Sequence, residues 1–264
     1  MVQSTALELL DIARAVAREA GALAATMRSA GISVASTKSS QLDIVTQADT
    51  AVETLIRERL LEARPGDAIL GEEGGEIGAG SEITWIVDPI DGTVNYLYGS
   101  TYYAVSIAAT ISDEQGDRTS IAGCVFAPAL ALEYTAAVGE PARLNGDVLQ
   151  VNTGVPLDKA LVSTGIPYDL SKRPRVLQDV TTLMPLIRDF RLVGAAALEI
   201  CGVAEGRTDG HFQRGLPIWD YAAATLIARQ AGAQIRITQT DSASAELLIV
   251  ASPELADELH PHLV

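Results

Sequence analysis

The stretch Trp85-Ile86-Val87-Asp88-Pro89-Ile90-Asp91-Gly92-Thr93 places two carboxylates three residues apart around a Pro-Ile corner. The apolar β-forming residues before Asp88 predict a buried strand, and the Gly-Thr pair allows a helix to begin after Asp91. Proline disfavours helix at the residue before it, so Asp88 should stay extended at the strand end, where the chain then turns. Ordinary turn chemistry, for which Asp-x-x-Asp-Gly is a common pattern, is the alternative interpretation of this stretch.

Further acidic residues follow other apolar runs of the chain. Glu72 and Glu73 come after a short predicted strand, 68–70, and because strand side chains alternate we expect only Glu72 to face a site. A solvent-exposed pair is the alternative, since glutamate is usually exposed. Asp220 precedes a predicted helix, 221–231, where an aspartate is most simply an N-cap. Buried carboxylates need a positive partner, and oxygen donors together predict a hard divalent cation.

Asp49 and Thr46 lie at the start of another predicted helix, 50–63. Either residue could simply cap this helix. A carboxylate near a threonine hydroxyl could also relay a proton to or from an attacking water. Both interpretations stay open at the level of sequence.

The bulk composition narrows the possible partners. The 264 residues carry a net charge of −15 and no Lys/Arg cluster, which argues against nucleic acid and against an anionic membrane surface. Cys124 and Cys201 lie in apolar stretches without metal-site spacing, so we expect buried free thiols in a reducing compartment. The first helix carries charges throughout, and no apolar run reaches transmembrane length. A cytoplasmic protein is expected.

The order of predicted elements indicates one unit, 1–264, built from two halves. In the first half, 1–150, helices at 4–29 and 50–63 precede β-strands between 83 and 137 and an Asn145-Gly146 hairpin. In the second half, 151–264, strands and helices alternate. An α+β half joined to an α/β half predicts layers in the order α-β-α-β-α.

Three segments of this chain resemble the signatures of the inositol monophosphatase family. They are Gly71-Glu72-Glu73, the stretch 85–96 with its Asp-Pro-Ile-Asp-Gly-Thr core, and Trp219-Asp220-Tyr221-Ala222-Ala223-Ala224. The segment 38–49 is similar to the family's Lys…Asp-x-Val-Thr-x-x-Asp segment. The resemblance implies a five-layer αβαβα sandwich, a homodimer, inhibition by Li⁺, and a phosphatase that uses two to three Mg²⁺ ions per subunit.

The resemblance also implies a role for each matching residue. Glu72, Asp88 and the carbonyl of Ile90 would hold a first metal, and Asp88, Asp91 and Asp220 a second, with Glu72 reaching a third through water. Thr93 and Asp49 would orient the nucleophile. The implied phosphate and substrate contacts are Asp91, Gly92, Thr93, Gly194, Ala195, Ala196, Gln213 and Asp220.

Two of these positions depart from the family pattern. Gln213 stands where the family often has a glutamate that contacts the inositol ring, and Ala195 stands where a hydroxyl residue is usual. Polyol recognition depends on placed donors and acceptors, so the substrate preference could differ. The resemblance favours myo-inositol 1-phosphate as the substrate. Fructose 1,6-bisphosphate, histidinol phosphate, 3′-phosphoadenosine 5′-phosphate, and a regulatory or scaffolding role through protein partners are the alternatives.

Overall fold

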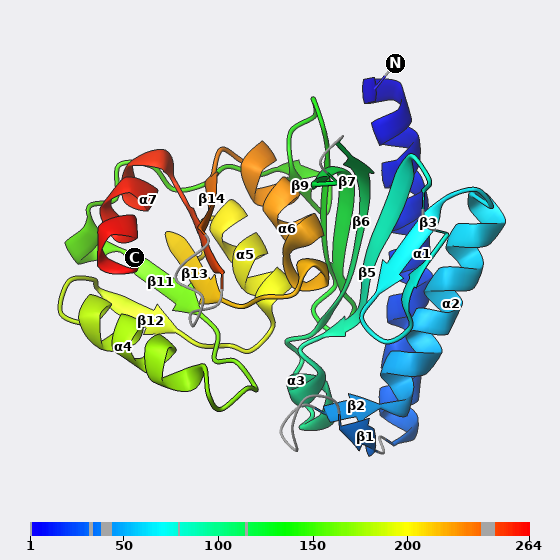
Figure 1. Cartoon of the computed structure of the whole chain (residues 1–264), viewed down its shortest axis with the longest axis horizontal. Coiled ribbons are helices and arrows are strands. Elements are labelled where there is room, and N and C mark those ends of the chain that lie inside the picture. The colour runs from blue at the N-terminus through cyan, green and yellow to red at the C-terminus, as the bar shows by residue number, and fades with distance from the viewer. Residues whose placement is uncertain (1, 32–33, 38–43, 79, 114–115, 239–245) are drawn as a thin grey trace.

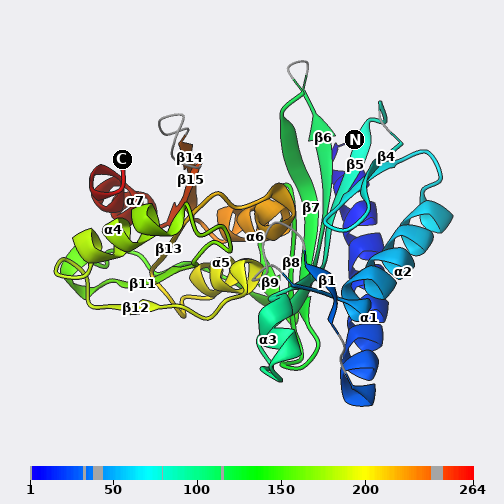
Figure 2. The ribbon, with the colours of Figure 1, turned by 60° about the horizontal axis from the view of Figure 1, so that its bottom comes forward.

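The computed structural model describes residues 2–31, 34–37, 44–78, 80–113, 116–238 and 246–264. Five layers follow one another across the molecule, as Figure 1 shows. Helices α1 (Val2–Ala30) and α2 (Gln47–Ala63) form the first layer, α5 (Ala196–Ala204) and α6 (Ile218–Gln230) the third, and α4 (Arg173–Leu183) and α7 (Pro253–Leu259) the fifth. A sheet separates each pair of helical layers (Figure 2). The predicted five-layer αβαβα sandwich is therefore confirmed.

The first sheet, in the described part of the chain, has eight strands in the order β10-β9-β8-β7-β6-β5-β3-β4. Its strands are β3 (Ala68–Gly71), β4 (Gly75–Ile77), β5 (Ile83–Asp91), β6 (Ala104–Ser112), β7 (Arg118–Ala127), β8 (Leu132–Ala137), β9 (Arg143–Leu144) and β10 (Asp147–Val148). The last two form the hairpin that the Asn-Gly pair predicts. Strands β1 (Val34–Thr37) and β2 (Ile44–Thr46) pair separately, beside the short helix α3 (Thr93–Leu97).

The second sheet has five strands in the order β12-β11-β13-β15-β14. Its strands are β11 (Leu161–Thr164), β12 (Asp189–Arg191), β13 (Gly210–Arg214), β14 (Gln234–Thr238) and β15 (Leu247–Ala251), and short 3₁₀ turns occupy Leu157–Lys159 and His260–His262. Strand β11 is parallel to both of its neighbours, whereas β15 is antiparallel to both of its own. None of the helices in the described ranges is both long and apolar enough to cross a membrane.

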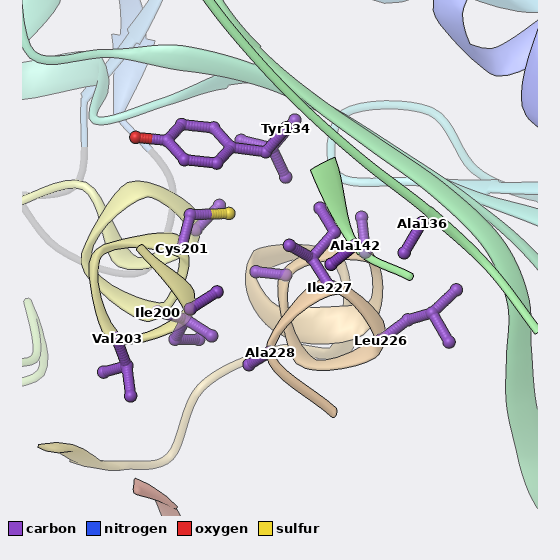
Figure 3. Close-up of a cluster of buried hydrophobic side chains, with 14 of the residues drawn as sticks. Tyr134, Ala136, Ala142, Ile200, Cys201, Val203, Leu226, Ile227 and Ala228 are labelled. Carbon is purple, nitrogen blue, oxygen red and sulfur yellow. The ribbon is translucent and has the colours of Figure 1, made fainter. Parts of the chain in front are cut away.

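Central strands are buried on both faces, because each sheet is covered by helices on both sides. In β5, Trp85 and Val87 pack toward α1 and α2, and Ile86 packs toward α5 and α6. In β15, Leu248 and Val250 join the middle core, whereas Leu247, Ile249 and Ala251 join the core beneath α4 and α7. This alternation explains why both strands are continuous apolar runs rather than alternating patterns. Figure 3 shows the middle core, where Tyr134 lies over Cys201 and Ile227.

Strand β5 extends through Pro89 to Asp91, which differs from the turn expected after Asp88. Asp88 pairs with Ser106 and Asp91 pairs with Ala104, so β5 uses one more residue than β6 over this interval. Such a bulge accommodates a proline that lacks an N–H, and it changes the direction of the side chains beside it. Both aspartates consequently remain in the sheet, and both are buried.

Helices α2 and α6, which carry site residues, begin earlier than their sequence patterns predict. Helix α2 begins at Gln47, with Thr46 as its N-cap and Asp49 completing a capping box. Helix α6 begins at Ile218, and its N-cap is Pro217. The N-cap interpretation of Asp220 is therefore wrong, because this residue lies inside the first turn of α6.

A buried ion pair ties the second sheet to its outer helix. The guanidinium of Arg214, on β13, bonds to Asp179 of α4, and both side chains are 2% exposed. Arg214 also donates to the backbone carbonyl of Leu263 near the C-terminus. Removing one partner of so deeply buried an ion pair destabilises the fold, because the remaining charge stays buried.

Candidate active site

A cavity of about 110 Å³ opens where the end of β5 meets the beginning of α5. It gathers residues from both sheets, and all the candidate site residues except Asp49 contribute to its wall. The lining residues are Glu72, Asp88, Ile90, Asp91, Gly92, Thr93, Gly165, Ile166, Tyr168, Gly194, Ala195, Ala196, Glu199, Gln213 and Asp220. The segment 38–43 of the family-like stretch before Asp49 lies outside the described residues.

Asp88 is a buried acid of this cavity whose pKa is strongly raised. Its side chain is 1% exposed, and Oδ1 accepts a hydrogen bond of 3.0 Å from the Ile90 N–H. Burial raises its pKa well above the usual range, and the carboxylates of Glu72, Asp91 and Asp220 raise the pKa further. These acids must therefore lie near one another, although they come from three separate segments of the chain.

Asp91 joins the two halves of the sandwich. Its carboxylate accepts hydrogen bonds from the N–H groups of Ala196 (3.0 Å) and Ala197 (2.9 Å), at the start of α5. Burial raises the pKa of Asp91 to about 7, while these two hydrogen bonds act in the opposite direction. A carboxylate at this position satisfies helix N–H groups that would otherwise lack partners. Asp91 thus has a structural contact as well as a place in the cavity wall.

Glu72 and its neighbour Glu73 have different surroundings. Glu72 follows β3, its N–H donates to the Val87 carbonyl, and the residue lines the cavity. The Glu73 N–H instead donates to the carboxylate of Glu53 at 2.8 Å, and Glu73 is not part of the cavity wall. Only one glutamate of the pair lies at the site.

Gly92 and Thr93 form the corner between β5 and α3. Gly92 has a φ of 86°, and a Cβ there would approach the Cβ of Ala195 and the carbonyl of Tyr102 to 3.1 Å. The Thr93 hydroxyl lies 3.1 Å from both the Ile90 carbonyl and Asp49 Oδ1. Glycine is needed here for its backbone conformation and for the close contact with α5.

Asp49 lies behind Thr93 rather than in the cavity wall. Its carboxylate is fully buried and accepts hydrogen bonds from the Thr46 N–H and hydroxyl as well as from Thr93. Burial raises the pKa of Asp49, and these hydrogen bonds lower it. The capping role is present, and the contact with Thr93 leaves a path for a proton.

The donor set of the cavity fits a hard divalent cation. Five acidic residues, Glu72, Asp88, Asp91, Glu199 and Asp220, share a wall to which no described lysine, arginine or histidine contributes. Across the described ranges, no three His, Cys, Asp and Glu side chains are already arranged in coordination geometry. The carboxylates therefore share the space and repel one another without forming a complete ligand shell. Mg²⁺ suits such a wall, because it retains several waters and needs few protein oxygens.

The wall of the cavity also contains residues that the sequence did not single out. Gly165 directly follows β11, and a Cβ there would lie 2.4 Å from the amide atoms of Gln213, so a larger residue would force this side chain to move. Its place at the end of an expected strand could have revealed it. No such signal marks Ile166 or Tyr168. Glu199 could not be found from the sequence either, because a glutamate within a helix is usually exposed.

Comparisons with known proteins agree with this geometry. The model of the inositol monophosphatase family matches residues 6–264. Inositol-1-monophosphatase SuhB of Mycobacterium tuberculosis (strain ATCC 25618 / H37Rv) is 42% identical over 232 residues, covering 84% of this chain and 78% of that protein. Nus factor SuhB of Escherichia coli (strain K12) is 36% identical over 226 residues, covering 85% and 83%.

A solved structure shows the same architecture. The crystal structure of extragenic suppressor protein suhB from Bartonella henselae superposes with a TM-score of 0.87 at 32% sequence identity, covering 97% of this chain and 98% of that chain. The similarity therefore extends over both sheets and over the cavity between them. This chain belongs to the inositol monophosphatase family.

Proposed function

We propose that this phosphatase is Mg²⁺-dependent and hydrolyses the phosphomonoester of a small polyol or sugar, with myo-inositol 1-phosphate as its best substrate. The observation that carries the proposal is the cavity at the end of β5, where five carboxyl groups from separate segments of the chain share one wall. An anionic substrate can enter such a cavity only when a cation reverses its field. The name of the mycobacterial relative supports the choice of substrate.

We expect the metal ions to bind where these carboxylates lie close together. Glu72, Asp88 and the Ile90 carbonyl would hold one ion, and Asp88, Asp91 and Asp220 a second, with a third reached from Glu72. Bound Mg²⁺ supplies Lewis-acid chemistry, because it neutralises phosphate charge and makes water a stronger nucleophile.

The chain's own groups would position the phosphate and move the proton. The backbone N–H groups of Gly92 and Thr93 would donate to phosphate oxygens, because no described backbone carbonyl accepts from them. The Thr93 hydroxyl would accept a hydrogen bond from the attacking water and pass a proton to Asp49, its partner at 3.1 Å. Attack in line with the leaving alkoxide would break its P–O bond and yield inorganic phosphate, and the alkoxide would take a proton from solvent water to become the free alcohol.

The far wall of the cavity would recognise the alcohol. Gln213 and Ala195 replace a charge and a hydroxyl of the family pattern, and Gln213 can accept or donate a hydrogen bond. The neutral amide of Gln213 suits the hydroxyl of a neutral polyol. Homodimerisation and inhibition by Li⁺ remain predictions from the family resemblance, and a cytoplasmic location remains a prediction from the sequence composition.

Phosphate release from a panel of polyol, sugar and nucleoside phosphates, with Mg²⁺ and with EDTA, tests the proposal. Asp88→Asn should abolish turnover, because it removes a ligand shared by two ions while keeping an oxygen for the Ile90 N–H. We prefer it to Asp91→Asn, which would also disturb the start of α5. Asp147→Asn, on the exposed β9–β10 hairpin, is the matched control. Turnover that persists in EDTA, or in Asp88→Asn, would overturn the proposal.

A further inference from the structure

Glu199 carries a buried carboxyl oxygen that has no hydrogen-bond partner. The residue lies in the first turn of α5 and is 3% exposed. Oε1 accepts a hydrogen bond of 2.7 Å from the Val193 N–H, whereas Oε2 has no partner among the described residues. Leaving such an oxygen unpaired is costly, so its presence calls for an occupant of the space beside it.

The carboxyl of Glu199 belongs to the wall of the candidate active site. It lines the same cavity as Asp91, Ala195 and Gln213. The side-chain oxygen of Gln213 is also buried and has no described partner. Two unpaired polar atoms in one wall indicate that this wall receives hydrogen bonds from the bound molecule rather than from the protein.

The position of Glu199 compensates for the two departures from the family pattern. Gln213 lacks the usual charge on the β13 side of the cavity, and Ala195 lacks the usual hydroxyl at the start of α5. Glu199 lies four residues after Ala195, and residues at this spacing share one face of a helix. An acidic group thus returns to the wall from which a hydroxyl is missing.

The chemistry of this carboxyl identifies the group that it would bind. Burial raises the pKa of Glu199 to about 8, so protonated and ionised forms are both accessible near neutral pH. A hydroxyl can accept from the protonated form and donate to the ionised form. A second phosphate would pair only with the protonated form, and an ammonium group would pair well only with the ionised form.

We infer that Glu199 is a substrate-binding residue that exchanges a hydrogen bond, through Oε2, with a hydroxyl of the polyol, and so determines preference for polyol phosphates over esters without hydroxyls. This inference rests on the proposed phosphatase function. It assigns to α5 a share in substrate recognition in addition to its contact with Asp91.

A purely structural role for Glu199 gives a different expectation. The residue also borders a neighbouring cavity of about 200 Å³, which Tyr102, Leu161, Val193 and Thr208 help to line. If Oε2 served only that cavity, or if Glu199 only held the Val193 N–H, its removal would affect all substrates equally. Selectivity between substrates therefore separates the two roles.

The test compares myo-inositol 1-phosphate with 4-nitrophenyl phosphate, whose leaving group has no further hydroxyl. For Glu199→Ala we expect kcat/KM on the polyol ester to fall about tenfold, mainly because KM rises. A tenfold change corresponds to the free energy of about one hydrogen bond. Activity on the nitrophenyl ester should change less than about twofold by the same reasoning. Glu205→Gln is the matched control, because Glu205 caps the other end of α5 and lies outside the candidate cavity.

Glu199→Gln keeps an oxygen for the Val193 N–H and serves as the readout if the alanine variant does not fold. Its loss should be smaller but again confined to the polyol ester. A series of deoxy-inositol phosphates then identifies the partner hydroxyl. Removing that hydroxyl should lower kcat/KM of the wild type but should not lower kcat/KM of Glu199→Ala any further.

The outcomes separate this inference from the proposed function. Equal losses on both esters, or no loss on either, would overturn the role of Glu199 while leaving the phosphatase intact. A wild-type protein that releases phosphate from neither ester would overturn the proposed function, and this inference with it.

Discussion

His211 should make this fold sensitive to mild acid. The imidazole lies on β13 and is fully buried, with Nδ1 2.9 Å from the Ser163 hydroxyl and no described partner for Nε2. Burial lowers its pKa from 6.5 to about 3, because the charged ring would lose its hydration without gaining a counter-ion. The native state therefore keeps His211 neutral at a pH where the unfolded chain protonates it.

The sign and size of the effect follow from proton linkage. Between pH 6.5 and pH 3 the unfolded state binds a proton that the native state does not, so the free energy of unfolding falls as the pH falls. From pH 7.5 to pH 5 the two pKa values give a loss of about 2 kcal/mol from this residue alone. The contribution is fully present above pH 7 and decreases steadily below pH 6.5.

Urea unfolding of the metal-free protein at pH 7.5 and pH 5 measures this contribution. His211→Asn removes the titrating group and keeps polar atoms for Ser163, so its loss of stability between the two pH values should be about 2 kcal/mol smaller than that of the wild type. His262→Asn, near the C-terminus and only partly buried, serves as the control and should behave as the wild type does. Equal pH dependence in the wild type and His211→Asn would refute the reasoning.

Three further predictions concern the core and the cavity. Arg214→Ala removes the buried partner of Asp179 and leaves only Arg175, whose side chain is 37% exposed and lies 3.1 Å away, so denaturant unfolding should show a loss of about 3 kcal/mol, and a loss below about 1 kcal/mol would contradict a buried pair. Gly92→Ala forces a non-glycine residue to a φ of 86°, which should cost about 1–2 kcal/mol and reduce phosphatase activity; unchanged melting would show that the corner tolerates a side chain. Cys124 and Cys201 are buried free thiols whose pKa burial raises, so a thiol reagent should label them only after unfolding, and rapid native labelling would exclude this placement.

The local elements of this protein, and with them the layer order, were accessible from the sequence. Buried strands such as β5 and β15 are continuous apolar runs, α2 carries a capping box at its start, and α1 ends before Gly31. Boundaries were less certain, because local pattern does not show where packing ends. Helix α6 includes Ile218 and Trp219, which precede the predicted helix 221–231, and Asp220 therefore lies in its first turn.

The sequence by itself determined which carboxylates lie at the ends of apolar runs. Glu72, Asp88 and Asp91 occupy such positions whatever the arrangement of the strands in space. Only the tertiary structure decided that they share one cavity with Asp220, which comes from another layer of the sandwich. It also decided that Asp91 bonds to the start of α5 and that the Glu199 carboxyl is buried beside the cavity. The physical reason is that hydrogen bonding and burial depend on neighbours remote in sequence, about which the spacing of residues along one segment carries no information.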